Sequence, residues 1–333
     1  MNSKIALVLG ATGGIGGEVA SRLVSSGWQV RALNRNPERA GKDGRVTWIK
    51  GDAMAAADVM AAAEGVSLIV HAVNPPGYRD WDKLVLPMLD NTIAAAKANG
   101  ARIILPGTVY NYGPDAFPVI AETAPQNALT RKGKIRVEME RRLRQATESG
   151  EAKVLIVRAG DFFGPKAANN WFSQGLVKPG SRPRSISYPG KRGTGHQWAY
   201  LPDVADIMVR LAEHDGLDAF ATFHMEGHWD ATGTAMTEAI RRALDDPFMA
   251  VKPMPWWLLR LASPFVTTLR ELMEMKYLWE QPVRLDNAKL VATLGGEPRT
   301  PLDEAVRATL AGVGCLQEKA PARAESKPSL SGI

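Results

Sequence analysis

The chain has 333 residues, of which 45% are hydrophobic and 23% charged, the composition of an ordinary globular protein. The single cysteine, Cys315, excludes a disulfide framework and any multi-cysteine metal site, and the five histidines lack metal-binding spacing, so no metal is expected. The net charge of +6 comes from scattered lysines and arginines without a basic stripe, which favours an anionic small molecule over nucleic acid as the partner.

No segment has the pattern of a membrane-inserted element. The N-terminal apolar run is short and interrupted by glycines, unlike a signal peptide. The most membrane-like stretch, 255–269, is too short to span a bilayer and contains Arg260 and two prolines. We therefore expect a cytoplasmic protein without stable membrane insertion, which also suits the low cysteine content. The polar tail at 315–333 is expected to be disordered.

In the first 160 residues, short apolar runs alternate with helix-length segments. The runs that we expect to be strands are 4–10, 29–34, 46–51, 68–73, 102–107 and 153–158. The helix-length segments among them are 15–26, 53–64, 83–99 and 131–149. This alternation predicts an α/β fold with a parallel sheet and crossover helices, and right-handed crossovers favour a doubly wound (Rossmann) sheet.

After residue 160 the pattern changes. Segment 164–197 is rich in Gly, Pro and Asn, which is typical of loops. Segment 200–214 predicts a helix with Asp203 as its N-cap, and 218–226 predicts a strand. Three further predicted helices, with no strands between them, are 233–244, 255–276 and 301–311.

This organisation predicts two regions. A dinucleotide-binding domain is expected over 1–160, with a return segment at about 198–224 that rejoins the sheet. A smaller, mostly helical substrate-binding cap is expected from 161–197 and 225–314.

The stretch "LGATGGIGGEV" carries the strongest functional signal. Gly10, Gly13 and Gly16 follow a strand directly and open a helix. The first two glycines allow a tight turn whose backbone approaches a pyrophosphate, and the third allows the helix to pack closely on the strand. The N-terminus of the helix then favours the anion. The alternative is a tight turn that binds nothing.

The end of the second strand indicates which dinucleotide is bound. Sites for NAD usually place Asp or Glu there, whereas this chain has Asn34 and Arg35. A cation in place of the acid fits a ribose 2′-phosphate, so we expect NADP(H), with NAD possible. Arg35 could instead be a solvated loop charge. Asp52, after the third strand, is placed either to reach the adenine or to cap helix 53–64.

These residues resemble the short-chain dehydrogenase/reductase superfamily, and within it the extended or atypical branch, the NAD-dependent epimerase/dehydratase family. The resemblance covers about residues 3–312 and is carried by "GATGGIG", "GTVYNYGP", "RAGDFFGP" and "WAYLPDVADIM". It implies a nucleotide-binding oxidoreductase. The residues that we expect to contact the cofactor are Gly10, Thr12, Gly13, Gly14, Ile15, Gly16, Asn34, Arg35, Asp52, Ala53, Ala72, Val73, Lys134 and Phe162.

The catalytic pair that the resemblance implies is incomplete. The family places Tyr-x-x-x-Lys on one helix face, where the lysine holds the cofactor ribose and the phenol exchanges a proton with substrate. Lys134 fits the lysine, but Thr130 stands in place of the tyrosine. Thr108 matches the family's catalytic Ser/Thr. Gly133, unfavourable inside a helix, is expected to face the cofactor, and Lys134 could otherwise be a surface lysine paired with Glu138.

Three interpretations of the missing tyrosine remain open. Thr130 could replace it as a much weaker acid. A phenol could come from Tyr110 or Tyr112, with Tyr110 first, because a residue two positions from Thr108 on an extended segment faces the same way. Both lead to an NADP(H)-dependent oxidoreductase or epimerase acting on a carbonyl or alcohol. The third is a non-catalytic regulator that binds or senses the dinucleotide.

The cap sequence leaves the substrate open. An apolar face over 255–276 predicts cap core or a homodimer contact, with a substrate wall or a membrane-surface helix as alternatives. A nucleotide sugar would need phosphate-binding cations, and a small ketone or lipid-like carbonyl would not. The cations that the cap could supply are Arg182, Arg184, Lys191 and Arg192.

Overall fold

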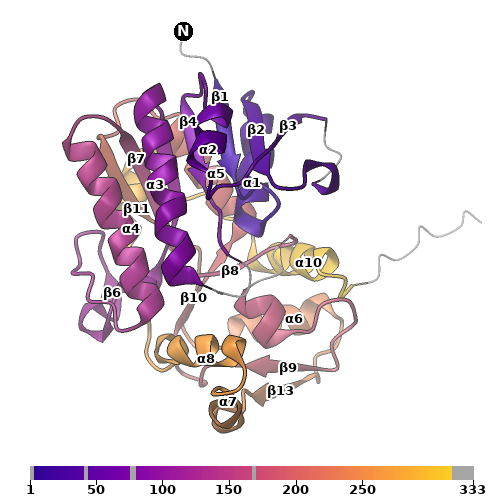
Figure 1. The fold of residues 1–333 in the computed structure, drawn as a ribbon. Helices are drawn as coiled ribbons and strands as arrows, with labels where there is room; N and C mark the ends of the chain where they lie inside the picture. The colour runs from indigo at the N-terminus through magenta and orange to yellow at the C-terminus, as the bar shows by residue number, and fades with distance from the viewer. Residues whose placement is uncertain (1–3, 41–43, 76–79, 167–169, 317–333) are drawn as a thin grey trace, which may run out of the picture.

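The computed structural model describes residues 4–40, 44–75, 80–166 and 170–316. Its centre is a seven-stranded parallel sheet in the order β11-β7-β5-β4-β1-β2-β3 (Figure 1). The strands are β1 (Ile5–Leu9), β2 (Gln29–Asn34), β3 (Val46–Lys50), β4 (Leu68–His71), β5 (Arg102–Thr108), β7 (Lys153–Ala159) and β11 (Phe220–His224). The predicted doubly wound α/β sheet is confirmed.

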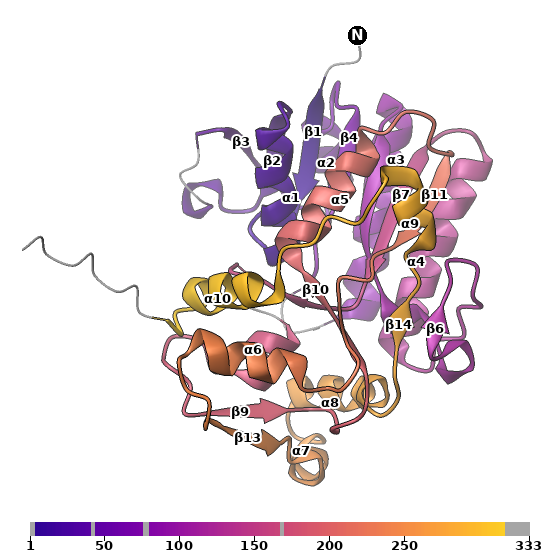
Figure 2. The ribbon, with the colours of Figure 1, turned by 180° about the vertical axis from the view of Figure 1, so that it is seen from behind.

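Helices cover both faces of the sheet. On one face lie α2 (Ala56–Ala62), α3 (Trp81–Asn99) and α4 (Arg131–Glu148), which share a core with β4 and β5. On the other face lie α1 (Gly14–Ser25), α5 (Leu201–Ala212) and α9 (Ala288–Leu294) (Figure 2). Burial on both faces explains why the central strands are continuous apolar runs rather than alternating ones.

The order of the strands reverses at β1, which lies between β4 and β2. Successive crossovers leave this point in opposite directions, so the loops after β1 and β4 diverge and open a crevice at the carboxyl ends of the strands. Open α/β sheets bind ligands at this position.

The second region combines helices with small sheets. Its helices are α6 (Ala235–Ala243), α7 (Trp256–Ala262), α8 (Thr267–Glu274) and α10 (Leu302–Gly312). Its strands are β6 (Val119–Ile120), β8 (Asp161–Phe163), β9 (Ser185–Tyr188), β10 (His196–Tyr200), β12 (His228–Asp230), β13 (Ala250–Pro253) and β14 (Arg284–Leu285). The aromatic core of this region includes Trp171, Trp198 and Trp279.

Several expectations for this region were wrong. Strand β13 lies between two helices where no strand was expected, and it pairs in parallel with β9. The single helix expected over 255–276 is broken at residues 263–266, which contain Pro264, because proline cannot continue a helix interior. Asp203 does not cap α5, whose N-cap is Tyr200; its carboxylate instead accepts hydrogen bonds from the backbone and hydroxyl of Thr300.

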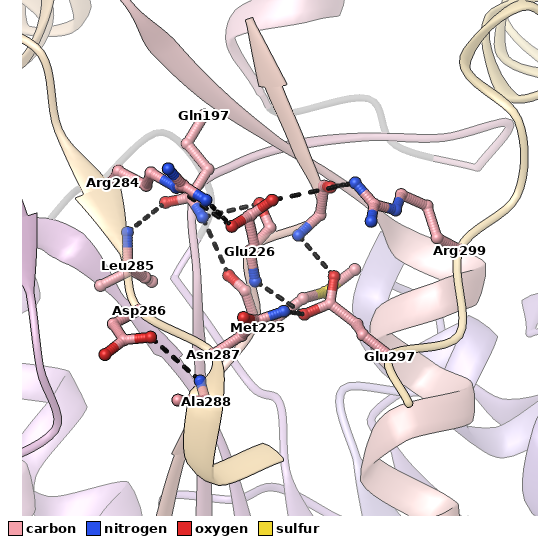
Figure 3. Close-up of polar contacts among 11 residues, drawn as sticks. Gln197, Met225, Glu226, Arg284, Leu285, Asp286, Asn287, Ala288, Glu297 and Arg299 are labelled. Atoms are coloured by element: carbon pink, nitrogen blue, oxygen red, sulfur yellow. Dashed lines mark hydrogen bonds and ion pairs between the residues drawn. The ribbon is translucent and has the colours of Figure 1, made fainter. Parts of the chain in front are cut away.

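A polar joint holds the C-terminal segment against the end of β11 (Figure 3). The carboxylate of Glu297 accepts a hydrogen bond from the backbone N–H of Glu226 at 2.9 Å. The side-chain amide of Gln197 donates to the carbonyls of Met225 and Glu226 and accepts from the N–H of Leu285 at 2.9 Å. These side chains satisfy backbone groups where the sheet ladder stops. They fix the path from the sheet into the second region, while the expected tail beyond residue 316 lies outside the described residues.

Candidate active site

A cleft of about 1040 Å³ lies at the carboxyl ends of the sheet strands. One end is formed by the β1–α1 turn and the ends of β2, β3 and β4. The other end is formed by the end of β5, by residues on α3, α4 and α8, and by the segments 160–162 and 170–174. We call these the cofactor end and the reaction end.

The glycine turn at the cofactor end has a shape that side chains would prevent. Gly10 has φ +90°, and a Cβ there would lie 2.5 Å from the carbonyl oxygen of Ala72. The N–H of Gly13 donates to the carbonyl of Gly10 at 2.9 Å, which closes the turn. A Cβ on Gly16 would lie 2.2 Å from the Gly10 oxygen, so this buried glycine serves helix packing and does not line the cleft.

The N-terminus of α1 faces the cleft with no side-chain cap. Its N-cap is Gly13, and the cleft is lined there by Thr12, Gly13, Gly14 and Ile15. The first N–H groups of a helix lack partners within the helix and carry the positive end of its dipole. An uncapped helix end beside a glycine cradle fits the diphosphate of a dinucleotide.

The far side of the cofactor end is lined by Asn34, Arg35 and Asp52, together with Ala53, Ala72 and Val73. Asp52 is not a helix cap: α2 begins at Ala56 with Ala55 as N-cap, and the Asp52 carboxylate accepts from the N–H of Met54 at 3.0 Å. Arg35 also lines the cleft here and is exposed.

Thr108 and Tyr110 both line the reaction end, but not for the expected reason. Thr108 ends β5, and its hydroxyl accepts a hydrogen bond from the N–H of Tyr110 at 2.9 Å. This bond starts a 3₁₀ turn over Val109–Asn111, so the chain between the two residues is not extended. Tyr110 is part of this turn and is among the residues that line the cleft.

Tyr112 is fully buried and takes no part in the cleft. Its hydroxyl accepts from Arg158 at 2.7 Å and lies 3.1 Å from Nε2 of His224. Arg158 in turn pairs with Glu140 at 2.5 Å. Burial raises the pKa of the Tyr112 phenol well above its ordinary value, despite the opposing effect of Arg158. Tyr112 is therefore a structural phenol.

The pair expected at the start of α4 lies away from the cleft. Thr130 is the N-cap of α4, and its hydroxyl accepts from the N–H of Gly133 at 3.0 Å. Lys134 is exposed and does not line the cleft. A Cβ on Gly133 would lie 2.3 Å from the Tyr110 carbonyl oxygen, so this glycine serves packing against the 3₁₀ turn and not against a cofactor. Glu138 pairs with two arginines of α4, Arg141 and Arg142.

Arg136 is the α4 cation that lines the cleft, and sequence reasoning did not select it. Its guanidinium lies 5.3 Å from the centre of the Trp81 ring and donates to the Pro106 carbonyl at 3.4 Å. His71 also lines the cleft, bonded through Nδ1 to the Thr92 hydroxyl at 2.8 Å. Burial, aided by the charge of Arg136, lowers the pKa of His71 to about 3, so this imidazole is neutral.

The second region closes the reaction end. Phe162, expected as a cofactor contact, lines the cleft beside Asp161, whose carboxylate lies 2.8 Å from Nε2 of His196. Leu272 of α8 also lines it, and α8 is tied to α4 by a buried ion pair between Lys132 and Glu271 at 3.0 Å. The other side chains that this region contributes are Asn170, Trp171, Gln174 and Leu201.

The cap cations considered for a nucleotide sugar lie elsewhere. All four are exposed and none lines the cleft: Arg182, Arg184, Lys191 and Arg192. Among the described residues, the cleft is lined by two cations, Arg35 at the cofactor end and Arg136 at the reaction end.

Comparisons with known proteins agree with this geometry. Residues 10–170 match a family described as NAD(P)H-binding. No curated protein sequence matches the chain. Among solved structures, UDP-glucuronic acid 4-epimerase from Bacillus cereus in complex with NAD is similar, with a TM-score of 0.74 at 15% identity over 93% of this chain and 98% of that one.

Two further structures show the same likeness. The Bordetella bronchiseptica enzyme WbmH in complex with NAD⁺ has a TM-score of 0.68 at 18% identity, covering 93% of this chain and 98% of that chain. UDP-glucose 4-epimerase from Thermotoga maritima with UDP-glucose has a TM-score of 0.70 at 15% identity, covering 92% and 98%. Residues 10–170, just under half of the chain, thus match an NAD(P)H-binding family, and the chain as a whole has the fold of these epimerases.

Proposed function

We propose that this protein is an NADP(H)-dependent oxidoreductase that interconverts a carbonyl and an alcohol. The observation that carries the proposal is the convergence of Thr108, Tyr110 and Arg136 on the same cleft as the uncapped glycine turn. When bound, the nicotinamide cofactor supplies or accepts the hydride. The division of the chain into a dinucleotide-binding domain and a substrate-binding cap, with the boundaries given above, is part of this proposal.

Arg35 supports NADP(H) rather than NAD as the cofactor. It lines the cofactor end next to Asn34, and it is exposed at the edge of the cleft. A guanidinium presents a rigid set of donors that matches a phosphate oxygen pair, whereas a 2′-hydroxyl needs a carboxylate acceptor. Two of the structurally similar proteins were solved with NAD, so the argument for NADP(H) rests on the residues of this chain alone.

At the reaction end, the side chains divide the acid–base work. The Tyr110 phenol gives a proton to the carbonyl oxygen during reduction and takes it back during oxidation. The Thr108 hydroxyl, which already accepts from the Tyr110 N–H, retains its own proton to donate to the same substrate oxygen. Arg136 faces the same cleft and favours the negative charge that develops on the phenol or the substrate oxygen.

The walls of the reaction end favour a substrate with apolar surface. They include Trp81, Val85, Met88, Trp171 and Leu272, with Asn170 and Gln174 as uncharged polar groups. A nucleotide sugar carries two phosphates and calls for cations, and the cap arginines that could supply them are not in the cleft. A small ketone or a lipid-like carbonyl fits these walls better.

The test compares two tyrosines of the same loop. Purified protein is offered NADPH and a panel of carbonyl compounds that includes apolar ketones and nucleotide sugars. Tyr110→Phe should lower kcat by about 100-fold or more, the size of a general-acid contribution, with cofactor affinity unchanged. Tyr112→Phe, which removes a buried hydroxyl from the Arg158 network, should lower stability by about 1–3 kcal/mol and leave kcat nearly unchanged. Equal activity of Tyr110→Phe and the unsubstituted protein would contradict the assignment.

The second candidate is a non-catalytic dinucleotide sensor. The observation in its favour is that the family's catalytic positions carry a helix cap, Thr130, and an exposed lysine, Lys134. A sensor would bind NADPH, turn over no compound in the panel, and change its affinity for a partner between the oxidised and reduced cofactor.

A further inference from the structure

An exposed apolar patch lies at the tip of the cap, on α7 and the turn after it. Phe265 is 88% exposed, Trp257 69% and Leu261 66%, and Leu258 and Val266 are also exposed. Helix α7 lies at the end of the cap farthest from the seven-stranded sheet (Figure 1). Single exposed apolar residues need no explanation, but five within ten consecutive residues at one tip indicate an interaction surface.

The part of the patch on α7 lies on one side of the helix, because its residues follow the spacing of helical turns. Trp257 and Leu261 are four residues apart on α7 and therefore lie on the same face. Leu258 lies beside them, and the chain continues into the exposed pair Phe265 and Val266. The other side of α7 is held to the cap, because the Trp256 indole donates to the Pro189 carbonyl at 2.8 Å. The apolar side chains thus project outward from a supported helix.

Exposed cations occur in and beside the segment that carries the patch. Arg260 lies within α7, Lys252 lies at the end of β13 just before it, and Arg270 lies on α8; all three are exposed. Of the acids that follow in the chain, Glu271 is buried in the ion pair with Lys132 and Glu280 is paired with Lys276, while Glu274 of α8 is partly buried. An apolar tip that carries exposed cations complements a surface that is apolar inside and anionic outside.

We propose that this tip docks the protein on the surface of an anionic phospholipid bilayer. Tryptophan and phenylalanine lodge at the boundary between headgroups and acyl chains, and arginine and lysine meet the anionic headgroups. Among the described residues, no helix is both long enough and apolar enough to cross a bilayer. The mode of attachment is therefore peripheral.

The size of the patch decides against a second copy of the chain as its occupant. A stable dimer buries about 800 Å² on each partner, contributed by roughly 20–30 residues. The patch consists of five apolar side chains on a short helix and one turn. The cations at its rim would also face each other across a symmetric contact, whereas anionic lipids neutralise them.

The docked tip lies next to the rim of the cleft. Trp256, on the inner side of α7, packs 6.1 Å from Trp171, and Trp171 lines the reaction end. The adjoining helix α8 contributes Leu272 to the same wall. Docking through α7 would hold this wall near the lipid surface, which suits entry of an apolar compound from the bilayer.

Vesicle co-sedimentation of the full chain, without cofactor or substrate, tests the proposal independently of the proposed enzymatic function. Vesicles of phosphatidylcholine alone are compared with vesicles that also contain phosphatidylglycerol, each at low and high salt. The protein should bind the anionic vesicles, less at high salt. The triple variant Trp257→Ser, Leu261→Ser, Phe265→Ser should bind at least about tenfold more weakly, because its apolar side chains no longer enter the interface.

Matched control variants distinguish docking through this tip from non-specific apolar binding and from an effect of net charge. Phe248→Ser removes an even more exposed aromatic, 92% exposed, located before the start of β13, and should leave binding unchanged. Arg260→Glu should weaken binding about tenfold, since each cation near an anionic surface contributes to affinity. Lys153→Glu makes the same charge change at the start of β7, at the amino ends of the sheet strands, and should have little effect.

Two outcomes would overturn the proposal. One is that the triple variant, shown to be folded by circular dichroism, binds anionic vesicles as well as the unsubstituted chain. The other is that the unsubstituted chain ignores both kinds of vesicle. If in that case it is a dimer that the triple variant converts to monomer, the occupant of the tip is a second copy.

Discussion

The two ends of the cleft are built in different ways. The cofactor end consists largely of backbone: a glycine turn, a helix N-terminus and the ends of neighbouring strands, mostly within residues 9–15 and 33–36. The reaction end consists of side chains from segments far apart in the chain, such as Tyr110, Arg136, Trp171 and Leu272. One end depends on local backbone conformation and the other on tertiary packing.

The difference determines how each end of the cleft tolerates substitution. A diphosphate cradle made of N–H groups tolerates change in most side chains, as long as the glycines remain. A proton donor needs one particular side chain at one position. Which side chain a helix provides there depends on which side of the helix faces the cleft. In this chain α4 presents Arg136 to the cleft and turns Lys134 to solvent.

The sharpest way to break the cofactor end is Gly10→Ala. A Cβ there would lie 2.5 Å from the Ala72 oxygen at a φ of +90°, so the turn must open. We expect NADPH affinity to fall by about 100-fold or more, because the N–H groups of the opened turn no longer point at the charged diphosphate. Gly27→Ala is the control: Gly27 has φ +81° but open space around it, so only a cost of about 1 kcal/mol in stability is expected. Calorimetric titration with NADPH measures the difference.

The stability of the folded protein in acid depends on two buried histidines, His71 and His224. Burial, aided by the charge of Arg136, lowers the pKa of His71 to about 3 at the cofactor end, and burial, aided by the charge of Arg158, does the same to His224. In the unfolded chain their ordinary pKa is near 6.5, so the unfolded state binds more protons between these values. The full stabilisation is present above pH 6.5 and is lost as the pH falls towards 3.

The expected loss is about 1.4 kcal/mol for each histidine and each pH unit below 6.5. Urea unfolding at pH 7 and at pH 5 measures it. His214→Gln, which changes an exposed histidine, should leave the slope with pH unaltered. A free energy of unfolding that stays constant from pH 7 to pH 5 would be inconsistent with neutral buried histidines.

Substituting two cations of α4 in turn tests which of them acts at the reaction end. Arg136→Ala should lower kcat/KM by about 10- to 100-fold, because a charge-assisted interaction in the cleft is removed. Lys134→Ala should change kcat/KM less than about twofold, because an exposed cation outside the cleft contributes little. The reverse ranking in steady-state assays with NADPH would restore the role that the family resemblance gives to Lys134.

The smallest expected effect concerns cofactor choice. Arg35→Ala should weaken NADPH binding about tenfold and leave NADH binding unchanged, because an exposed charge pair is partly screened by solvent. Arg39→Ala is the matched control, an exposed arginine of the same loop that does not line the cleft. Fluorescence titration of both cofactors reads out the ratio, and equal NADPH and NADH affinities in the unsubstituted protein would reject the assignment of Arg35.

The Rossmann half could be predicted closely because its signals are local. Strand β2 has the predicted bounds, and the other sheet strands differ by a few residues at their ends. The return of the chain to the sheet at β11 was also predicted. In the cap, short strands such as β9 and β13 pair over long separations, and nothing in a single short segment indicates such a partner.

Arg136 lines the cleft and Lys134 does not, and the sequence contains a pattern that accounts for this difference. Ile135, Met139 and Leu143 mark the buried face of the helix at spacings of four residues. Arg136 lies next to this face and Lys134 lies off it, so the apolar phase favours Arg136 as the inward cation. The spacing of the family motif predicts Lys134 instead. Tyr110 lines the cleft, and its role as proton donor stays a prediction; its sequence does not indicate the 3₁₀ turn that contains it.

The structure of the complex with NADPH is the most direct test of this account. It predicts the diphosphate on the N–H groups at Thr12–Ile15, with nicotinamide C4 turned towards the reaction end and the Tyr110 hydroxyl within about 4 Å of the space where a substrate oxygen would lie. A diphosphate bound away from the glycine turn, or a nicotinamide ring with no acidic group facing C4, would contradict it.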